Sequence, residues 1–359
     1  MNKIAKAIAV SLSTFITANA TTVVHLGEEN EYYGFNVEEK GNTYLIKQAY
    51  VFDNAPSGRV VLDIPGQLDG KQIEFAPKCF KNFGAAKLVA TSLRFSRVNG
   101  VGARMPQDCG RFCECAISLR SVDFHNVDAT ANITDMSDMF YLSRNINKVD
   151  FGDLNTSNVT NMSGLFKCCH GLGEINYGNF ATNNVTDMSF MFAGCCKLPR
   201  EAMNNLNTQN VRNMRCMYRM AGFKTLNFGA NFNTDNVTDM SGMFSANKEL
   251  LEIDISRFHT DRVTDMSNMF EGCSRITALD LERCNTSELR NITGLIKNCS
   301  SLQDLRLPLQ GFRQDIQGAD NNIFEGCYSL SHNGKIKYQD GQVIDFGQMT
   351  ADNINRLND

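Results

Sequence analysis

The sequence predicts an α/β repeat solenoid with short parallel strands on one face and short helical or 3-10 turns on the other. The first observation is a phrase, Asn-Val-Thr-Asp-Met-Ser-Gly-Met-Phe at residues 236–244, that recurs along the chain. The second is its spacing, because seven copies begin 26 residues apart, at Asn132, Asn158, Asn184, Asn210, Asn236, Arg262 and Glu288. A fixed period of this length is typical of a solenoid. The third is that each copy has its large apolar side chains at the same places, so that stacked copies bury what one copy alone could not.

The repeated phrase predicts the helical turn. In the second copy Val159, Met162 and Phe166 are spaced to share one face of a short helix. Asn161, which is Asp in other copies, is suited to cap the first N–H groups of such a helix. A glycine two residues after the aromatic anchor, Gly194 for example, is suited to end it in a left-handed conformation.

The second half of each copy predicts the strand. Leu172-x-x-Ile175-x-Tyr177 and its equivalents alternate as a short strand does, and they match the Leu-x-x-Leu-x-Leu of leucine-rich repeats. A threonine, Thr182 in this copy, follows at fixed spacing in a turn rich in Asn, Ser and Asp. Stacked copies would place parallel strands about 4.8 Å apart.

The combined pattern V-T-D-M-S-x-M-F-x-x-C-x-x-L-x-x-L-x-L resembles the BspA-type leucine-rich repeat of bacterial and some protist surface proteins. Its 26-residue period and paired methionines resemble the subfamily first catalogued as a mycoplasma domain of unknown function. The resemblance covers residues 132–307 strongly. It implies a surface protein that acts in adhesion, whereas the matching residues themselves are packing residues.

The same alignment predicts the domain organisation. We expect a secretory signal peptide at residues 1–20 and an N-terminal cap at 21–57, with a strand within residues 44–52. Leading and degenerate repeats then fill 58–131, and regular repeats fill 132–309. A last degenerate repeat with a C-terminal cap and tail is expected at 310–359.

The first residues favour export. Lys3 and Lys6 precede an apolar stretch at residues 7–16, and Ala18-Asn19-Ala20 suits cleavage before Thr21. We therefore expect a secreted or cell-surface protein of a bacterial envelope. The alternative is a cytoplasmic protein whose apolar stretch is accidental. No later stretch reaches the roughly 18 apolar residues of a membrane span.

The composition limits the classes of binding partner that we expect. The net charge of −4 and pI near 5.8 show no basic excess, so neither nucleic acid nor an anionic membrane is expected. Five of the thirteen cysteines form one column three residues after the Phe or Ile anchor, a place that Asn247 and Ala221 also occupy. We interpret this column as small, buried, reduced thiols, with oxidation of some stacked pairs as the alternative. The column is Cys169, Cys195, Cys273, Cys299 and Cys327.

No motif indicates catalysis, a metal or a cofactor. Cys109-x3-Cys113-x-Cys115 with His125 is metal-like but lacks the paired Cys-x2-Cys of tetrahedral zinc sites. The five histidines share no motif that would pair one with a nucleophilic cysteine. A hydrolase using Cys113 or His125 is therefore only the third hypothesis. The acidic column that begins at Asp135 is interrupted by Asn161, which favours capping over a calcium ladder.

What remains is a binding surface. The outward strand positions form columns on the sheet face that vary from copy to copy, and variation on a fixed scaffold is how solenoids build binding faces. We expect a non-catalytic protein that binds a protein or extracellular macromolecule with a basic patch. An intracellular scaffold or a secreted effector is the alternative. The candidate contact residues are Lys148, Asp150, Glu174, Arg200, Glu252, Asp254, Asp280, Glu282 and Arg306.

Overall fold

The computed structural model describes most of the chain and divides it into two compact units, Met1–Asn184 and Val185–Asp359, which we treat separately. The predicted signal peptide and Arg200 lie outside the described residues. The described residues are 21–25, 33–51, 59–84, 90–130, 132–198, 206–308, 312, 316–318, 321–333, 335–338 and 342–345.

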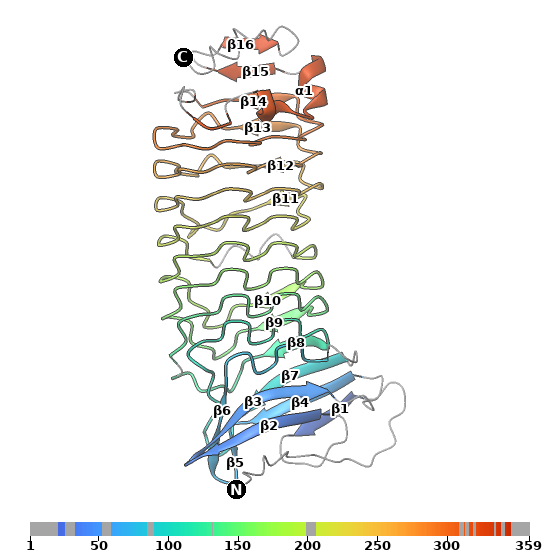
Figure 1. Ribbon diagram of the computed structural model, residues 1–359, viewed down its shortest axis with the longest axis vertical. Coiled ribbons are helices and arrows are strands. Elements are labelled where there is room, and N and C mark those ends of the chain that lie inside the picture. The colour runs from blue at the N-terminus through green and yellow to red at the C-terminus, as the bar shows by residue number, and fades with distance from the viewer. Residues whose placement is uncertain are drawn as a thin grey trace. The chain divides into compact units, whose positions relative to one another are not determined.

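A parallel sheet runs through the first unit, one strand to each coil of the chain (Figure 1). The register advances by one coil at each step, so that Asp123 pairs with Asp150 and Asp150 pairs with Asn176. The predicted parallel-strand face is therefore confirmed in this unit. In spatial order its strands are β1 (Thr21–His25), β4 (Arg59–Pro65), β7 (Ala90–Ser96), β8 (Leu119–Asp123), β9 (Lys148–Asp150) and β10 (Glu174–Asn176).

A second sheet lies in the N-terminal part of this unit. An antiparallel hairpin joins β2 (Tyr33–Lys40) to β3 (Thr43–Val51), which confirms the predicted strand. Strand β3 then pairs in parallel with β6 (Lys71–Phe75), whose other neighbour is β5 (Gln67–Leu68). That these residues act as a cap stays a prediction.

The second unit repeats the parallel strands in shorter form. Leu279 pairs with Leu305 at the 26-residue period, whereas Leu226 pairs with Ile253 at 27 residues and Leu305 pairs with Ile336 at 31. The last pair, β15 with β16, is antiparallel. The strands are β11 (Thr225–Leu226), β12 (Glu252–Ile253), β13 (Ala278–Asp280), β14 (Asp304–Arg306), β15 (Lys335–Tyr338) and β16 (Gln342–Asp345).

The predicted helical turns on the other face are wrong. Among the described residues the only helices are a 3-10 turn, η2 (Asn321–Phe324), and α1 (Tyr328–Asn333), both after the regular repeats. The repeated phrase instead forms successive β-turns. In one copy these turns are closed by Leu165 N–H to Met162 C=O at 3.2 Å and Cys169 N–H to Phe166 C=O at 2.9 Å.

Backbone hydrogen bonds to the next coil replace the helix. The N–H groups of Met136, Asp138 and Phe140 bond to carbonyls 25 residues on, at 2.8–2.9 Å, and the second unit repeats this pattern. Such bonds between coils require extended or turn backbone, because an α-helix directs its N–H groups along its own axis. Both faces of each coil are thus tied to the next one.

The β-turns also explain why glycines recur at fixed positions in the repeat. In each regular coil two residues of these turns have positive φ, for instance Gly164 at 63° and Cys168 at 60°. These are the third residues of two turns, where a type II turn requires positive φ. Gly194, at φ 76°, has the left-handed conformation that we expected, but it belongs to such a turn and not to a helix end.

The Asp/Asn column next to these turns does not cap helices either. Asn161 accepts a hydrogen bond from the N–H of Ser163 at 3.0 Å, which is an Asx turn, and its amide donates to Asp135 of the preceding coil at 3.0 Å. The threonines that recur once in each copy of the repeat form a second ladder of hydrogen bonds. The hydroxyl of Thr234 accepts from the N–H of His259 and donates to the carbonyl of the same residue.

Aromatic anchors stack along the core of the second unit. Phe244 is 1% exposed and lies between Tyr218 and Phe270, with ring centroids 5.7 and 5.5 Å away and nearly parallel planes. Its removal would leave a cavity between two coils that the backbone ladder holds at fixed spacing.

We therefore expect Phe244→Ala to lower the free energy of unfolding by roughly 3–5 kcal/mol, measured by chemical denaturation. Met220→Ala is the control, because Met220 is exposed and Ala246 has the same left-handed backbone one coil on. The control should change stability by less than about 0.5 kcal/mol. Equal stability of Phe244→Ala and the wild type would contradict the stacked core.

The thirteen cysteines are present as thiols, and the predicted column is buried. The thiol of Cys273 donates to the carbonyl of Phe244 in the preceding coil at 3.2 Å, and the amide of Asn247 makes the equivalent bond to Tyr218 at 2.7 Å. Burial raises the pKa of Cys273 to about 12. The column therefore holds small buried side chains, and Cys273 and Asn247 also donate to the preceding coil, whereas the side chain of Ala221 has no donor.

Thiol labelling of the native chain should follow burial, because the reactive species is the thiolate. Cys196 is exposed and should react rapidly with an aromatic disulfide reagent, whereas Cys273 and Cys299 should react only after unfolding. Mass spectrometry of peptides at timed quenching measures this, with Cys196→Ser as the control. Equal labelling rates at Cys196 and Cys273 in the native chain would contradict the buried column.

Candidate functional site

The ends of strands β8, β9 and β10 bring three polar side chains into one column of the first unit. Asp123, Asp150 and Asn176 each accept a hydrogen bond from the backbone N–H two residues on, at 2.9, 3.0 and 3.3 Å. The column thus makes the turn that leaves each strand. Asp150, predicted as a partner contact, has this structural task as well.

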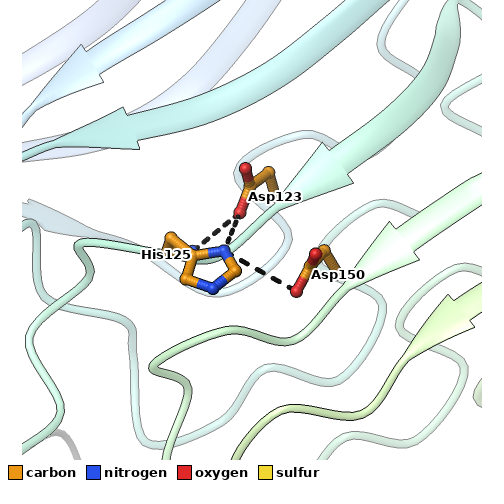
Figure 2. A group of neighbouring side chains, drawn as sticks. All are labelled: Asp123, His125 and Asp150. Carbon is orange, nitrogen blue, oxygen red and sulfur yellow. Dashed lines mark hydrogen bonds and ion pairs between the residues drawn. The ribbon is translucent and has the colours of Figure 1, made fainter.

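His125 joins two of these carboxylates (Figure 2). Its Nδ1 lies 2.7 Å from Oδ1 of Asp123 and 3.7 Å from Oδ1 of Asp150. The hydrogen bond with Asp123 and the negative charges of Asp123 and Asp150 raise the pKa of His125. One ligand atom from each of the three residues lies within 4.8 Å of the others, so that this group could hold a metal ion.

A glycine makes room for the imidazole. Gly152 has φ 41°, and a Cβ there would lie 2.6 Å from the backbone nitrogen of His125 and 2.8 Å from its ring carbon Cγ. Any larger residue at this position would displace His125. The approach of the two coils therefore depends on Gly152.

The other predicted residues of the first unit form a cross-strand ion pair. Nζ of Lys148 on β9 lies 2.6 Å from Oε1 of Glu174 on β10, and both side chains are exposed. This hydrogen bond raises the pKa of Lys148. The structure thus places Lys148 and Glu174 as exposed register partners on neighbouring strands, whereas the side chain of Asp150 is only 11% exposed.

A groove of about 420 Å³ lies over strands β12 to β15 of the second unit. Three of the predicted residues line it: Glu252, Asp280 and Arg306. The sequence analysis missed Lys335, because this residue comes from the expected tail, whereas the structure pairs β15 with β14. The remaining lining residues are Ile253, Ala278, Leu279, Asp304 and Leu305.

Charged side chains surround this groove. Arg306 contacts Asp280 at 3.2 Å and Glu282 at 3.4 Å, and all three are exposed. Asp254, also predicted as a contact residue, is not among the residues that line this groove, and it accepts a hydrogen bond from Ser256 N–H at 2.9 Å. The hydrogen bonds from Ser256 lower the pKa of Asp254.

The Cys/His chemistry considered from the sequence has little support in the geometry. Cys113 is fully buried, and burial raises its pKa well above the usual value, which disfavours the nucleophilic thiolate. The thiol of Cys109 donates to the carbonyl of Pro106 at 3.2 Å. His125 contacts carboxylates instead of a cysteine.

Residues 112–228 and 222–337 match the family model described as "Mycoplasma protein of unknown function, DUF285". The chain belongs to this family. The matched region begins within the degenerate coil and includes His125, Asp150 and the regular repeats. The expected resemblance to a mycoplasma domain of unknown function is thereby confirmed.

The DUF285 chain is also similar to two solved structures. One is described as the Toll–Spatzle complex, a molecular hub in Drosophila development and innate immunity; identity is 13%, the TM-score is 0.24, and the match covers 88% of this chain and 50% of that one. The glycosylated form of that complex gives 14% identity, a TM-score of 0.22, and coverage of 84% and 52%. The chain spans about half the length of the solved chains that it matches. No curated protein matches it.

The sequence analysis missed the pairing of Asp123 and His125 with Asp150. Asp123 and Asp150 are 27 residues apart, one more than the period of the regular DUF285 repeats, so the 26-residue alignment does not place them in one column. The pattern Asp-x-His at the end of a strand, followed by Asp at the end of the next, was the available signal.

Among the described residues, no helix is long and apolar enough to cross a membrane.

Proposed function

We propose that this protein is a non-catalytic, exported solenoid that binds other proteins through the groove of its second unit. The observation that carries the proposal is the groove over β12 to β15, lined by charged side chains whose positions the strand register fixes. Residues that pack vary little from coil to coil, whereas those that face the groove differ at each coil. This is how repeat proteins combine one scaffold with a specific surface.

The charges around the groove favour a basic partner. Three acidic side chains line it and Glu282 borders it through Arg306, against the two basic side chains of Arg306 and Lys335. Acidic surfaces steer basic partners, and such association weakens as salt screens the charges. The three that line the groove are Glu252, Asp280 and Asp304.

Export and adhesion rest on the sequence. Residues 1–20 have the order of a secretory signal, and the repeat resembles the BspA-type surface proteins. We infer that the partner is a host or environmental macromolecule outside the cell. The buried thiols favour a second candidate, an intracellular scaffold or an effector, because reduced cysteines are typical of the cytosol.

The groove can be tested by removing charge without removing the turn. Asp280→Asn keeps an Asx acceptor, as Asn176 does in the same column, and together with Asp304→Asn it removes two negative charges that line the groove. We expect binding to immobilised polylysine, a uniform basic probe, to weaken roughly 2- to 30-fold at low salt, because each exposed charge pair contributes about 0.2–1 kcal/mol. Surface plasmon resonance across a salt series measures this.

The matched control removes the same charge elsewhere. Asp261→Asn with Glu288→Gln changes two exposed acidic residues that do not line the groove. If both double variants lose affinity equally, net charge governs binding and the groove is not the site. Unchanged affinity of the groove variant would also overturn the proposal.

Export is tested by the mature N-terminus. We expect the protein fractionated from its native cells to begin at Thr21 and to occur in the envelope or the medium. Mass spectrometry of the N-terminal peptide in each fraction measures this. An intact Met1 in the cytosolic fraction would exclude the adhesin and leave the intracellular scaffold.

A further inference from the structure

We propose that Asp123, His125 and Asp150 of the first unit form a zinc-binding site, with the fourth coordination position open to water or to a ligand. The site lies on the ends of β8 and β9 and is independent of the groove in the second unit. It would hold Zn²⁺ through Nδ1 of His125 and one carboxylate oxygen from each aspartate (Figure 2).

The distances between the donor atoms suit a small tetrahedral ion. Zinc binds nitrogen and carboxylate oxygen at about 2.0–2.2 Å, so neighbouring ligand atoms of a tetrahedral site lie roughly 3.3 Å apart. Nδ1 of His125 lies 2.7 Å from Asp123 and 3.7 Å from Asp150, on either side of this value. The ligand oxygens of the two aspartates lie within 4.8 Å of each other, so that rotation of an aspartate side chain toward the imidazole would complete the three protein ligands.

Strand pairing brings two like charges together at this place. Asp123 and Asp150 are register partners on adjacent parallel strands. Within the part of the chain that the structure describes, neither forms an ion pair with a lysine or arginine, and the nearby Lys148 pairs with Glu174. A divalent ion between the two carboxylates would neutralise their charge.

Neighbouring residues hold Asp150 in the orientation that the site needs. The amide of Asn176 donates to Oδ2 of Asp150 at 2.9 Å, and Asn176 is itself fixed by the N–H of Gly178. This leaves Oδ1 of Asp150 facing His125. Ligating carboxylates in metal sites are characteristically supported by such outer hydrogen bonds.

Exposure and donor type distinguish zinc from other ions. The side chain of Asp150 is 11% exposed, whereas those of Asp123 and His125 are each 49% exposed, so that solvent reaches the fourth position. Calcium takes six to eight oxygen ligands, and magnesium keeps oxygen ligands in octahedral geometry. A site of one imidazole and two carboxylates favours zinc.

The test is calorimetric titration of the untagged, reduced, chelator-treated full chain with ZnCl₂. We expect one zinc per chain at this site and no measurable heat from CaCl₂ at the same concentrations. His125→Gln and Asp150→Asn should each reduce the zinc affinity at least about tenfold, since even the loss of an outer-shell partner typically costs 10- to 100-fold. Asn176→Ala, a positioning change, should cost roughly 10- to 100-fold.

Two controls make the result decisive. His259→Gln removes a histidine paired with one aspartate, Asp235, and should leave the zinc affinity unchanged. Asp150→Asn places in the column the residue that Asn176 already has, and circular dichroism melting would verify its fold. Cobalt(II) in place of zinc should show no thiolate charge-transfer band in the near ultraviolet.

Zinc affinity in His125→Gln equal to that of the wild type, or a cobalt thiolate band that persists in this variant, would overturn the site and assign the ion to cysteines. No binding by the wild-type chain would overturn it as well. Loss of binding in His259→Gln to the same extent as in His125→Gln would show that histidine content, and not this geometry, governs the affinity.

Discussion

The backbone hydrogen bonds between successive coils are the constraint on which the rest of this structure depends. They run along the strands and also along the turns of the opposite face, where Met136, Asp138 and Phe140 bond to the coil that follows. Where the strand ladder ends, buried side chains such as Thr234 supply equivalent bonds between coils. A coil that lost a residue here would break bonds on several sides, which explains the exact 26-residue period.

This ladder stacks residues of one column directly on one another, and the consequence depends on their chemistry. Aromatic rings and threonine hydroxyls gain from stacking, whereas carboxylates repel. Several columns avoid repulsion by alternation: Asn161 donates to Asp135, and Lys148 pairs with Glu174. Asp239 and Asp265 are also stacked carboxylates, but Asp123 and Asp150 share His125 as a common neighbour, which is why we assign a cation to that place.

The repeat period and the strand positions could be predicted because both depend on apolar spacing alone. The turns could not, because residues at i, i+3 and i+7 share one face in a helix and also in a series of β-turns. Two positive-φ positions in each regular coil distinguish the β-turns from a helix, and glycines there would have signalled the turns in the sequence. At one of these positions, however, several coils have other residues, namely Asp138, Phe190 and Cys216. The interactions between coils impose this conformation against the local preference of those residues.

The candidate sites were predictable only where their residues follow the repeat period. Glu252, Asp280 and Arg306 were found because they follow the regular period, whereas Asp123 lies one residue outside it and Lys335 comes from beyond the repeats.

The two strand-face columns also differ in how freely they can change. Asp254 and Asp280 each hold a turn through an Asx hydrogen bond, so only Asp or Asn preserves the local backbone there. Ala278, Glu252 and Asp304 form the other column and are exposed, and no such turn depends on them. In the binding function that we propose, specificity would vary through this second column, while the Asx column keeps the strand ends in place.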